Sequence, residues 1–222
     1  MNNININASV LSEGLHQIVG VVERKQTMPI LSHVLMECSN KTLTITATDL
    51  EVQLSSTISD IDSSDDFITT IPGRKAFEII RSLGNKEIEI AVSESTVVIK
   101  SSNSSFKLQA LAANEFPLFD ASGSENYFGV KQKEIKSLFT KTQFSMAQQD
   151  VRFYLNGLLL EISPNTLVSV GTDGHRLSKS KISIEKTKIN ETSYILPRKA
   201  VQEVQRIISD QGETKITFSD NR

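Results

Sequence analysis

The chain has 222 residues, and its 24 Lys or Arg against 26 Asp or Glu give a formal net charge of −2. This balance argues against a protein that is basic over its whole surface, as many nucleic-acid binders are, but it leaves room for a locally basic face. The single cysteine, Cys38, excludes an internal disulfide framework, and the lack of a signal peptide or of an apolar stretch near the ~20 residues that span a bilayer predicts a cytoplasmic protein.

The first half of the chain alternates between helix and strand patterns. Apolar residues at helical spacing predict a helix over 9–22, with Ser9 or Ser12 as its N-cap. A second helix is expected to open at Pro72 and to stop at Gly84. Apolar runs and period-two alternation predict antiparallel strands over 30–37, 42–48, 52–58, 67–71, 87–92, 96–101 and 105–111.

The same order begins again after a linker over 119–126 that is rich in Asp, Ser and Gly. A strand over 127–130 precedes a helix over 133–145, and a further helix opens at Pro197. Strands are predicted over 155–162, 166–171, 177–184, 194–196 and from 215 onward.

An ungapped offset of 124 residues aligns the two halves. Thr48-Asp49 meets Thr172-Asp173, and Arg74-Lys75-Ala76 meets Arg198-Lys199-Ala200. The chain is therefore predicted to be α+β, with two copies of one unit that has two helices packed on antiparallel sheet. We expect domains over 1–120 and 126–222. The second copy stops earlier in its pattern than the first, which predicts that it is truncated at its C-terminal end and that the natural protein continues.

Cations concentrate in the helical segments and the loops before them. They are Arg24, Lys25, Arg74, Lys75, Arg81, Lys131, Lys133, Lys136, Lys141, Arg198, Lys199 and Arg206. If the helices of both copies lie on one side of a shared sheet, that side is basic and suits a phosphate backbone without reading sequence. The alternative is that these are ordinary exposed helix cations.

No catalytic or metal-binding constellation emerges, so no cofactor is expected. Asp173 and His175 can be read as a carboxylate orienting a general base. The repeat argues against this, because Asp49 occupies the same position with no histidine nearby. Asp173 is therefore expected to accept turn hydrogen bonds, and Cys38, which aligns with Ile162, is expected in the core.

Residues that only the second copy carries are candidates for function. Gly174-His175-Arg176-Leu177 replaces Leu50-Glu51-Val52-Gln53 of the first copy. Tyr154 and Leu155 precede a strand whose neighbour ends at Thr172, so we expect them beside this tetrapeptide. Together they would form a small apolar patch, edged by His and Arg, that suits a peptide with one or two apolar anchors. The alternative is that Leu155 and Leu177 are core residues.

Three motifs of the second copy resemble the bacterial DNA polymerase III β subunit family, the replicative sliding clamps. They are Gln149-Asp150-Val151-Arg152-Phe153-Tyr154-Leu155-Asn156-Gly157, Thr172-Asp173-Gly174-His175-Arg176-Leu177 and Pro197-Arg198-Lys199. The first copy agrees through Glu23-Arg24-Lys25, Pro29-Ile30-Leu31, Ala47-Thr48-Asp49-Leu50-Glu51 and Glu115-Phe116-Pro117. The match covers essentially the whole chain as the first domain and most of the second of a three-domain family, with the third domain absent.

The resemblance implies a non-catalytic processivity factor. In the family, a head-to-tail homodimer forms a ring of six similar domains with helices lining the hole. Such a ring encircles double-stranded DNA without sequence preference. It tethers the replicative polymerase, the clamp loader and other proteins through a peptide-binding pocket.

The resemblance also implies site residues. The DNA contacts are Arg24, Gln149, Phe153 and Tyr154, to which position and charge add Arg74, Lys75, Arg198 and Lys199. The wall of the peptide pocket is Leu155, Thr172, Gly174, His175, Arg176 and Leu177. Phe106 and Leu108 match the edge of the first domain that meets another chain, and both are expected to be exposed without that chain. Phe153 stands where the family often has Tyr.

Two other functions stay open from the sequence. One is a peptide-binding adaptor whose contact with DNA is incidental. The other is a hydrolase that uses Asp173 and His175.

Overall fold

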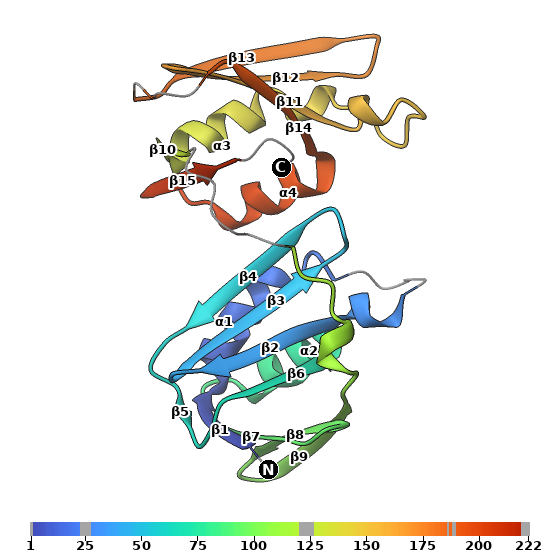
Figure 1. The fold of residues 1–222 in the computed structure, drawn as a ribbon, viewed down its shortest axis with the longest axis vertical. Coiled ribbons are helices and arrows are strands. Elements are labelled where there is room, and N and C mark those ends of the chain that lie inside the picture. The colour runs from blue at the N-terminus through green and yellow to red at the C-terminus, as the bar shows by residue number, and fades with distance from the viewer. Residues whose placement is uncertain (1, 23–27, 120–126, 186, 188–189, 219–222) are drawn as a thin grey trace. The chain divides into compact units, whose positions relative to one another are not determined.

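The computed structural model describes residues 2–22, 28–119, 127–185, 187 and 190–218. The chain divides into two compact units, Met1–Asp120 and Ala121–Arg222, each with its own helices and sheets (Figure 1). None of the helices described in these ranges is long and apolar enough to cross a bilayer.

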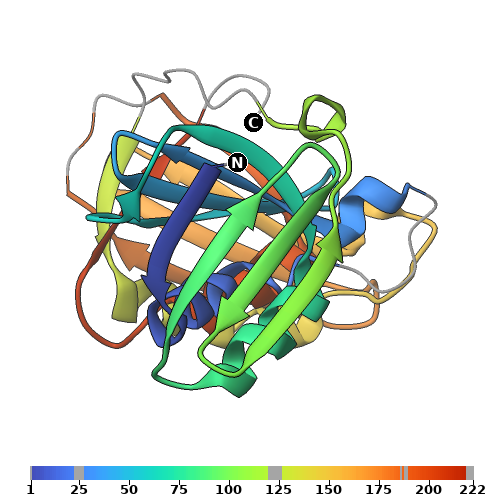
Figure 2. The ribbon, with the colours of Figure 1, turned by 90° about the horizontal axis from the view of Figure 1, so that it is seen from below.

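Within its described residues, the first unit contains two sheets, two α-helices and two 3-10 helices. Its elements are β1 (Asn2–Asn7), α1 (Ala8–Ile18), η1 (Pro29–Ser32), β2 (His33–Ser39), β3 (Thr42–Thr48), β4 (Gln53–Ile58), β5 (Asp62–Ser63), β6 (Phe67–Pro72), α2 (Gly73–Leu83), β7 (Glu87–Val92), β8 (Thr96–Ser101), β9 (Ser104–Gln109) and η2 (Ala113–Glu115). One sheet has the order β4-β3-β2-β6 and the other β5-β1-β7-β8-β9. Figure 2 shows β9 at the edge of the five-stranded sheet.

The start of the first unit differs from the sequence expectation. Asn2–Asn7 forms a strand that was not predicted, and it pairs with β7. Helix α1 is capped by Asn7, whose side chain accepts a hydrogen bond from Ser9 N, so the prediction of Ser9 or Ser12 as the cap is wrong. The strand expected from Ile30 begins at His33, because Pro29 opens a 3-10 helix there.

The second unit repeats this plan over fewer elements. They are β10 (Tyr127–Lys131), α3 (Gln132–Thr140), η3 (Gln143–Ser145), η4 (Phe153–Leu155), β11 (Gly157–Ser163), β12 (Thr166–Thr172), β13 (Leu177–Ser183), β14 (Thr192–Pro197), α4 (Arg198–Ile207) and β15 (Glu213–Thr217). The sheets have the orders β13-β12-β11-β14 and β10-β15, and every pairing is antiparallel. The predicted α+β class is confirmed.

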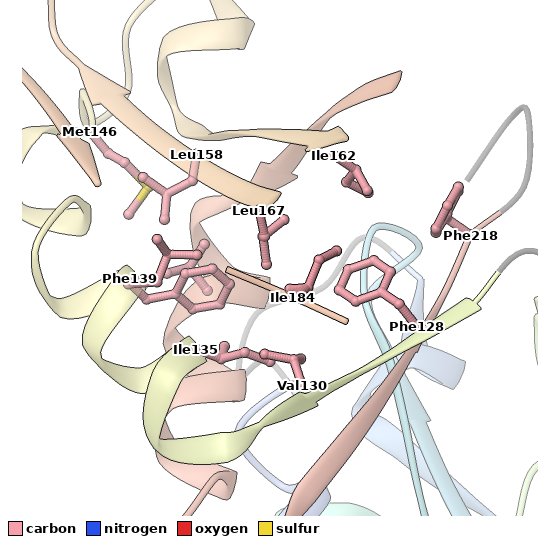
Figure 3. Close-up of a cluster of buried hydrophobic side chains, with 12 residues drawn as sticks. Phe128, Val130, Ile135, Phe139, Met146, Leu158, Ile162, Leu167, Ile184 and Phe218 are labelled. Atoms are coloured by element: carbon pink, nitrogen blue, oxygen red, sulfur yellow. The ribbon is translucent and has the colours of Figure 1, made fainter. Parts of the chain in front are cut away.

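A buried cluster holds the second unit together. The cluster includes Ile135 and Phe139 of α3, Leu158 of β11, Leu167 of β12 and Phe128 of β10 (Figure 3). Burying an aliphatic or aromatic side chain contributes about 1.5–3 kcal/mol. This core fixes β11 and β12, the strands from which the candidate site extends.

The repeat is confirmed in the strands, but its register shifts before the last helix. His33 pairs with Pro72 and Gly157 pairs with Pro197. The first residues of these pairs are 124 positions apart and the second are 125 apart, so the connection before β14 is longer by one residue. The predicted alignment of Arg74 with Arg198 is therefore wrong by one position.

Candidate functional site

The turn that follows β12 is closed by Thr172 and Asp173. The hydroxyl oxygen of Thr172 accepts from Gly174 N at 3.1 Å. Asp173 Oδ1 accepts from the backbone N–H groups of His175 and Arg176, at 3.0 Å each. These backbone hydrogen bonds, of which that from His175 is the strongest cause, lower the pKa of Asp173.

The first unit builds the same turn with Thr48 and Asp49. Asp49 Oδ1 accepts from Glu51 N at 3.0 Å and from Val52 N at 2.8 Å. The hydroxyl oxygen of Thr48 accepts from Leu50 N at 3.1 Å. The structural role predicted for Asp173 is confirmed, since the same bonds form where there is no histidine.

The other carboxylate oxygen of Asp173 is also engaged. Arg176 Nε donates to Asp173 Oδ2 at 2.9 Å. The described bonds of this carboxylate therefore run to two backbone N–H groups and a guanidinium, and they give no support to a pairing of Asp173 with the His175 ring.

Leu177 and Leu155 differ in exposure. Leu177 is the first residue of β13, pairs with Thr172 and is 64% exposed. Leu155 is only 6% exposed. The alternative that both leucines are core residues is thus wrong for Leu177, whose side chain is exposed, whereas Leu155 is buried.

The segment between η3 and β11 forms a loop that is closed on itself. Ala147 N donates to Leu155 O at 2.9 Å. The Asn156 side chain accepts from Asp150 N at 3.0 Å and donates to Asp150 O at 2.8 Å. Gln149 has a left-handed backbone with φ of 58°. These bonds fix a compact loop whose outer side chains face solvent.

The outer surface of this loop is apolar and aromatic. Phe153 is 86% exposed, and Val151, Tyr154 and Gln149 are also exposed. Val151, Phe153 and Tyr154 are close together in the loop, and exposed apolar side chains that adjoin one another suit contact with a partner. Gln149, Phe153 and Tyr154, which the sequence proposes as DNA contacts, thus lie on one loop.

Arg152 links this loop to the turn after β12. Its guanidinium donates to Asp150 through Nε at 3.0 Å and through Nη2 at 2.9 Å. Side-chain hydrogen bonding from Arg152 lowers the pKa of Asp150 to about 2. A Cβ placed on Gly174 would lie 3.3 Å from Arg152 Nη2, so the guanidinium lies directly over this glycine.

Sequence reasoning assigned no role to Arg152 or Phe144 at this surface. Arg176 Cζ lies 5.9 Å from the centre of the Phe144 ring, which is exposed. The prediction of a continuous helix over 133–145 is wrong, because the helix ends at Thr140 and a 3-10 turn follows. Phe144 lies in that turn, so the predicted helix did not indicate that it belongs to this surface. Arg152 stood within a recognised motif, but only the fold shows its contact with Gly174.

The basic residues predicted to face DNA have different surroundings. Arg74 Nε donates to Val22 O at 2.7 Å, and Arg198 Nη1 lies 3.3 Å from Ala147 O. Lys75 is exposed and Lys199 is half-buried. Arg24 lies outside the described residues. A basic side common to both copies stays a prediction.

Strand β9 lies at the edge of the five-stranded sheet, where no further described strand pairs with it, but it does not present two exposed apolar side chains. Leu108 is 2% exposed, so the expectation that it is exposed is wrong, because it faces the interior of the first unit opposite Val97 of β8. Phe106 is half-buried. The edge is therefore available mainly through backbone groups and Phe106.

Among the described side chains, no three His, Cys, Asp or Glu residues form a group that could hold a metal ion. Cys38 is buried and unpaired, as expected for a core residue.

Two family models match almost the whole chain. The DNA polymerase III beta subunit, N-terminal domain, matches residues 2–120, and the central domain of the same subunit matches residues 129–222. A beta sliding clamp from Pseudomonas aeruginosa is 39% identical over 215 residues, which are 96% of this chain and 59% of that protein. The Escherichia coli K12 beta sliding clamp is 37% identical over 207 residues, 93% of this chain and 56% of that protein.

Solved structures give the same result. The chain superposes on a DnaN sliding clamp from Pseudomonas aeruginosa bound to griselimycin with a TM-score of 0.92 and 36% identity, covering 99% of this chain and 60% of that one. A Bacillus subtilis sliding clamp shares the fold with a TM-score of 0.93 at 21% identity, covering 99% of this chain and 60% of that one. The chain thus spans less than two thirds of the length of these relatives.

Proposed function

The chain belongs to the DNA polymerase III beta subunit family, and on that premise we propose that it acts as a non-catalytic processivity factor. It forms part of a sliding clamp that encircles duplex DNA and tethers the replicative polymerase, the clamp loader and other proteins in the cytoplasm. The observation that carries this proposal is the contact of Arg152 with Gly174, which joins an exposed aromatic loop to the turn that bears Leu177.

The loop over 148–154 serves as a DNA contact in this proposal. Gln149 supplies an amide for phosphate or sugar, while Phe153 and Tyr154 supply exposed rings. Such contacts position a duplex without reading its sequence. Arg24, Lys75 and Lys199 contribute positive charge to DNA binding, so the binding depends on counterion release and weakens as salt rises.

The turn after β12 serves as one wall of the peptide site. The exposed Leu177 receives an apolar anchor, and Thr172, Gly174, His175 and Arg176 form the polar border. One anchor contributes about 1.5–3 kcal/mol. A peptide that binds with a micromolar dissociation constant requires a binding free energy of about 8 kcal/mol. Contacts from other parts of the protein must therefore supply the rest.

The free edge of β9 serves as the contact with a second chain in a head-to-tail homodimer. An unpaired edge strand offers a row of N–H and C=O groups that another strand can pair with. Phe106 adds apolar area on one face of that edge, whereas Leu108 contributes by shaping the core beneath it.

The test compares the residence time of the full-length protein on closed circular and on linear duplex DNA after loading. A ring slides off free ends, so we expect a much longer residence on the circle. We also expect equilibrium binding to a short linear duplex to be weak and to fall steeply with salt. Equal residence times on the two DNAs would contradict the proposal.

A peptide-binding adaptor that does not encircle DNA is the second candidate, favoured by the exposure of Leu177. It predicts peptide binding that depends on Leu177, together with equal residence on linear and circular DNA. The same pair of measurements therefore separates the two functions.

A further inference from the structure

Arg198, the first residue of α4, contacts both ends of the exposed loop of the second unit. Its backbone N–H donates to Asn156 O at 3.0 Å, at the end of the loop. Its side-chain Nη1 donates to Ala147 O at 3.3 Å and to Met146 O at 3.4 Å, at the start. One residue thus bridges the two chain segments from which the loop projects.

These contacts add to the bonds that close the loop. Ala147 N donates to Leu155 O, and the Asn156 side chain forms two hydrogen bonds with the backbone of Asp150. The side chains of Met146 and Ala147 are buried, so their carbonyl groups belong to a fixed part of the unit. A guanidinium donates several hydrogen bonds in a rigid geometry, which suits it to hold two neighbouring carbonyl groups.

The first unit makes an equivalent bond independently. Arg74 Nε donates to Val22 O at 2.7 Å. Val22 corresponds to Met146 at the offset of 124 residues, whereas Arg74 is the second residue of α2 and Arg198 is the first residue of α4. The two units therefore keep the bond to the same carbonyl although the arginine stands at different positions of the helix.

We infer that Arg198, and Arg74 through the same bond, are positioning residues that hold the chain after the first helix of each unit. In the second unit, Arg198 fixes the loop that carries Gln149, Phe153 and Tyr154, and it acts on DNA through that loop instead of binding phosphate itself. This inference rests on the proposed function for its effect on DNA, but the effect on the loop is independent of it.

Amide hydrogen exchange tests the effect on the loop without DNA. In Arg198→Gln, we expect exchange over residues 148–155 to speed up about tenfold while β11, β12 and β13 keep their wild-type rates. The matched control is Lys133→Gln, which removes one positive charge from an exposed position of α3. Wild-type exchange over 148–155, or equal acceleration across the unit, would overturn the inference.

DNA binding separates positioning from direct contact. We expect Arg198→Gln to weaken binding in the wild-type background but to have no further effect when Gln149, Phe153 and Tyr154 are all replaced by Ala. The slope of log affinity against log salt should stay unchanged, whereas the loss of a direct phosphate contact lowers it by about 0.9.

The inference would be overturned if Arg198→Gln weakened DNA binding by the same factor in the triple Ala background as in the wild type and also reduced the slope of log affinity against log salt. If the triple Ala variant binds DNA like the wild type, the proposed DNA contact of the loop fails, and hydrogen exchange still decides the role of Arg198 in holding it.

Discussion

Asp49 and Asp173 accept the same pair of backbone hydrogen bonds in the two units, from the second and third residues that follow each of them. The residue directly after each aspartate also has a left-handed backbone, with φ of 77° at Leu50 and 89° at Gly174. The turn is thus common to both units, and the side chain at its tip is what differs. Because Gly174 has no side chain, the guanidinium of Arg152 can lie over this position of the turn.

Replacing either aspartate should destabilise its unit. Asp173→Ala removes the carboxylate that accepts from two backbone N–H groups, and we expect the free energy of unfolding to fall. Asp49→Ala should have a similar effect. Urea denaturation measures both, and Asp173→Asn, which keeps an acceptor oxygen, is the matched control. An unchanged midpoint in Asp173→Ala would show that the turn does not need the carboxylate.

Gly174→Ala should weaken peptide binding and reduce stability by about 1 kcal/mol, because its φ of 89° is unfavourable for a residue with a Cβ. The new methyl group also meets Arg152 Nη2 at 3.3 Å, which forces the guanidinium away from the turn. Gly129→Ala is the control, since a Cβ at Gly129 meets no atom within 4 Å. Calorimetric titration with a partner peptide and urea denaturation give the two readouts. Wild-type affinity in Gly174→Ala would place the peptide elsewhere.

The strands with period-two alternation could be predicted from the sequence. Residues 42–48 form β3 as expected, because Leu43 and Ile45 face the core while their neighbours carry hydroxyls. Strand β1 was missed because its apolar residues, Ile4 and Ile6, alternate with Asn, which is rare in strands. Pairing with β7 supplies the stabilisation that local propensity lacks.

The candidate site was predictable as a set of motif residues but not as a set of contacts. The turn role of Asp173 followed from the repeat alone. The position of Arg152 over Gly174 and the bonds of Arg198 depend on how segments far apart in sequence come together. The one-residue shift before α4 was hidden by an Arg-Lys-Ala identity at the wrong offset, because an ungapped comparison cannot detect an insertion.

His33 should make the stability of the first unit depend on pH. The residue is buried, and the desolvation that burial brings lowers its pKa below the ordinary value of 6.5. The hydroxyl of Thr70 donates to Leu111 O and therefore accepts from His33 Nδ1–H at 3.2 Å. Burial, not this hydrogen bond, favours the neutral imidazole in the folded state. The unfolded state therefore binds more protons just below pH 6.5, and stability falls as the pH drops through that value toward the lower pKa of the folded state.

The measurement is the free energy of unfolding of wild type and His33→Gln at pH values above and below 6.5. We expect a larger loss at acidic pH in the wild type than in the variant. His16 and His175 are present in both proteins, so their contributions cancel in the comparison. The same loss in both proteins would show that His33 titrates normally.

Leu177→Asp should abolish binding of a partner peptide to the full-length protein while leaving the fold intact. Leu177 is largely exposed at the start of β13, so a carboxylate there stays hydrated and costs the folded state little. In a complex the same carboxylate would be desolvated against an apolar anchor, and the loss of one buried leucine alone removes about 1.5–3 kcal/mol, at least tenfold in affinity. Ile195→Asp is the matched control, because Ile195 is an exposed apolar residue of β14, at the opposite edge of the same sheet from β13. Calorimetric titration should show peptide binding by Ile195→Asp and none by Leu177→Asp. Equal affinity of the two variants for the peptide would show that Leu177 is not part of the peptide site, and its exposure would then have no functional explanation.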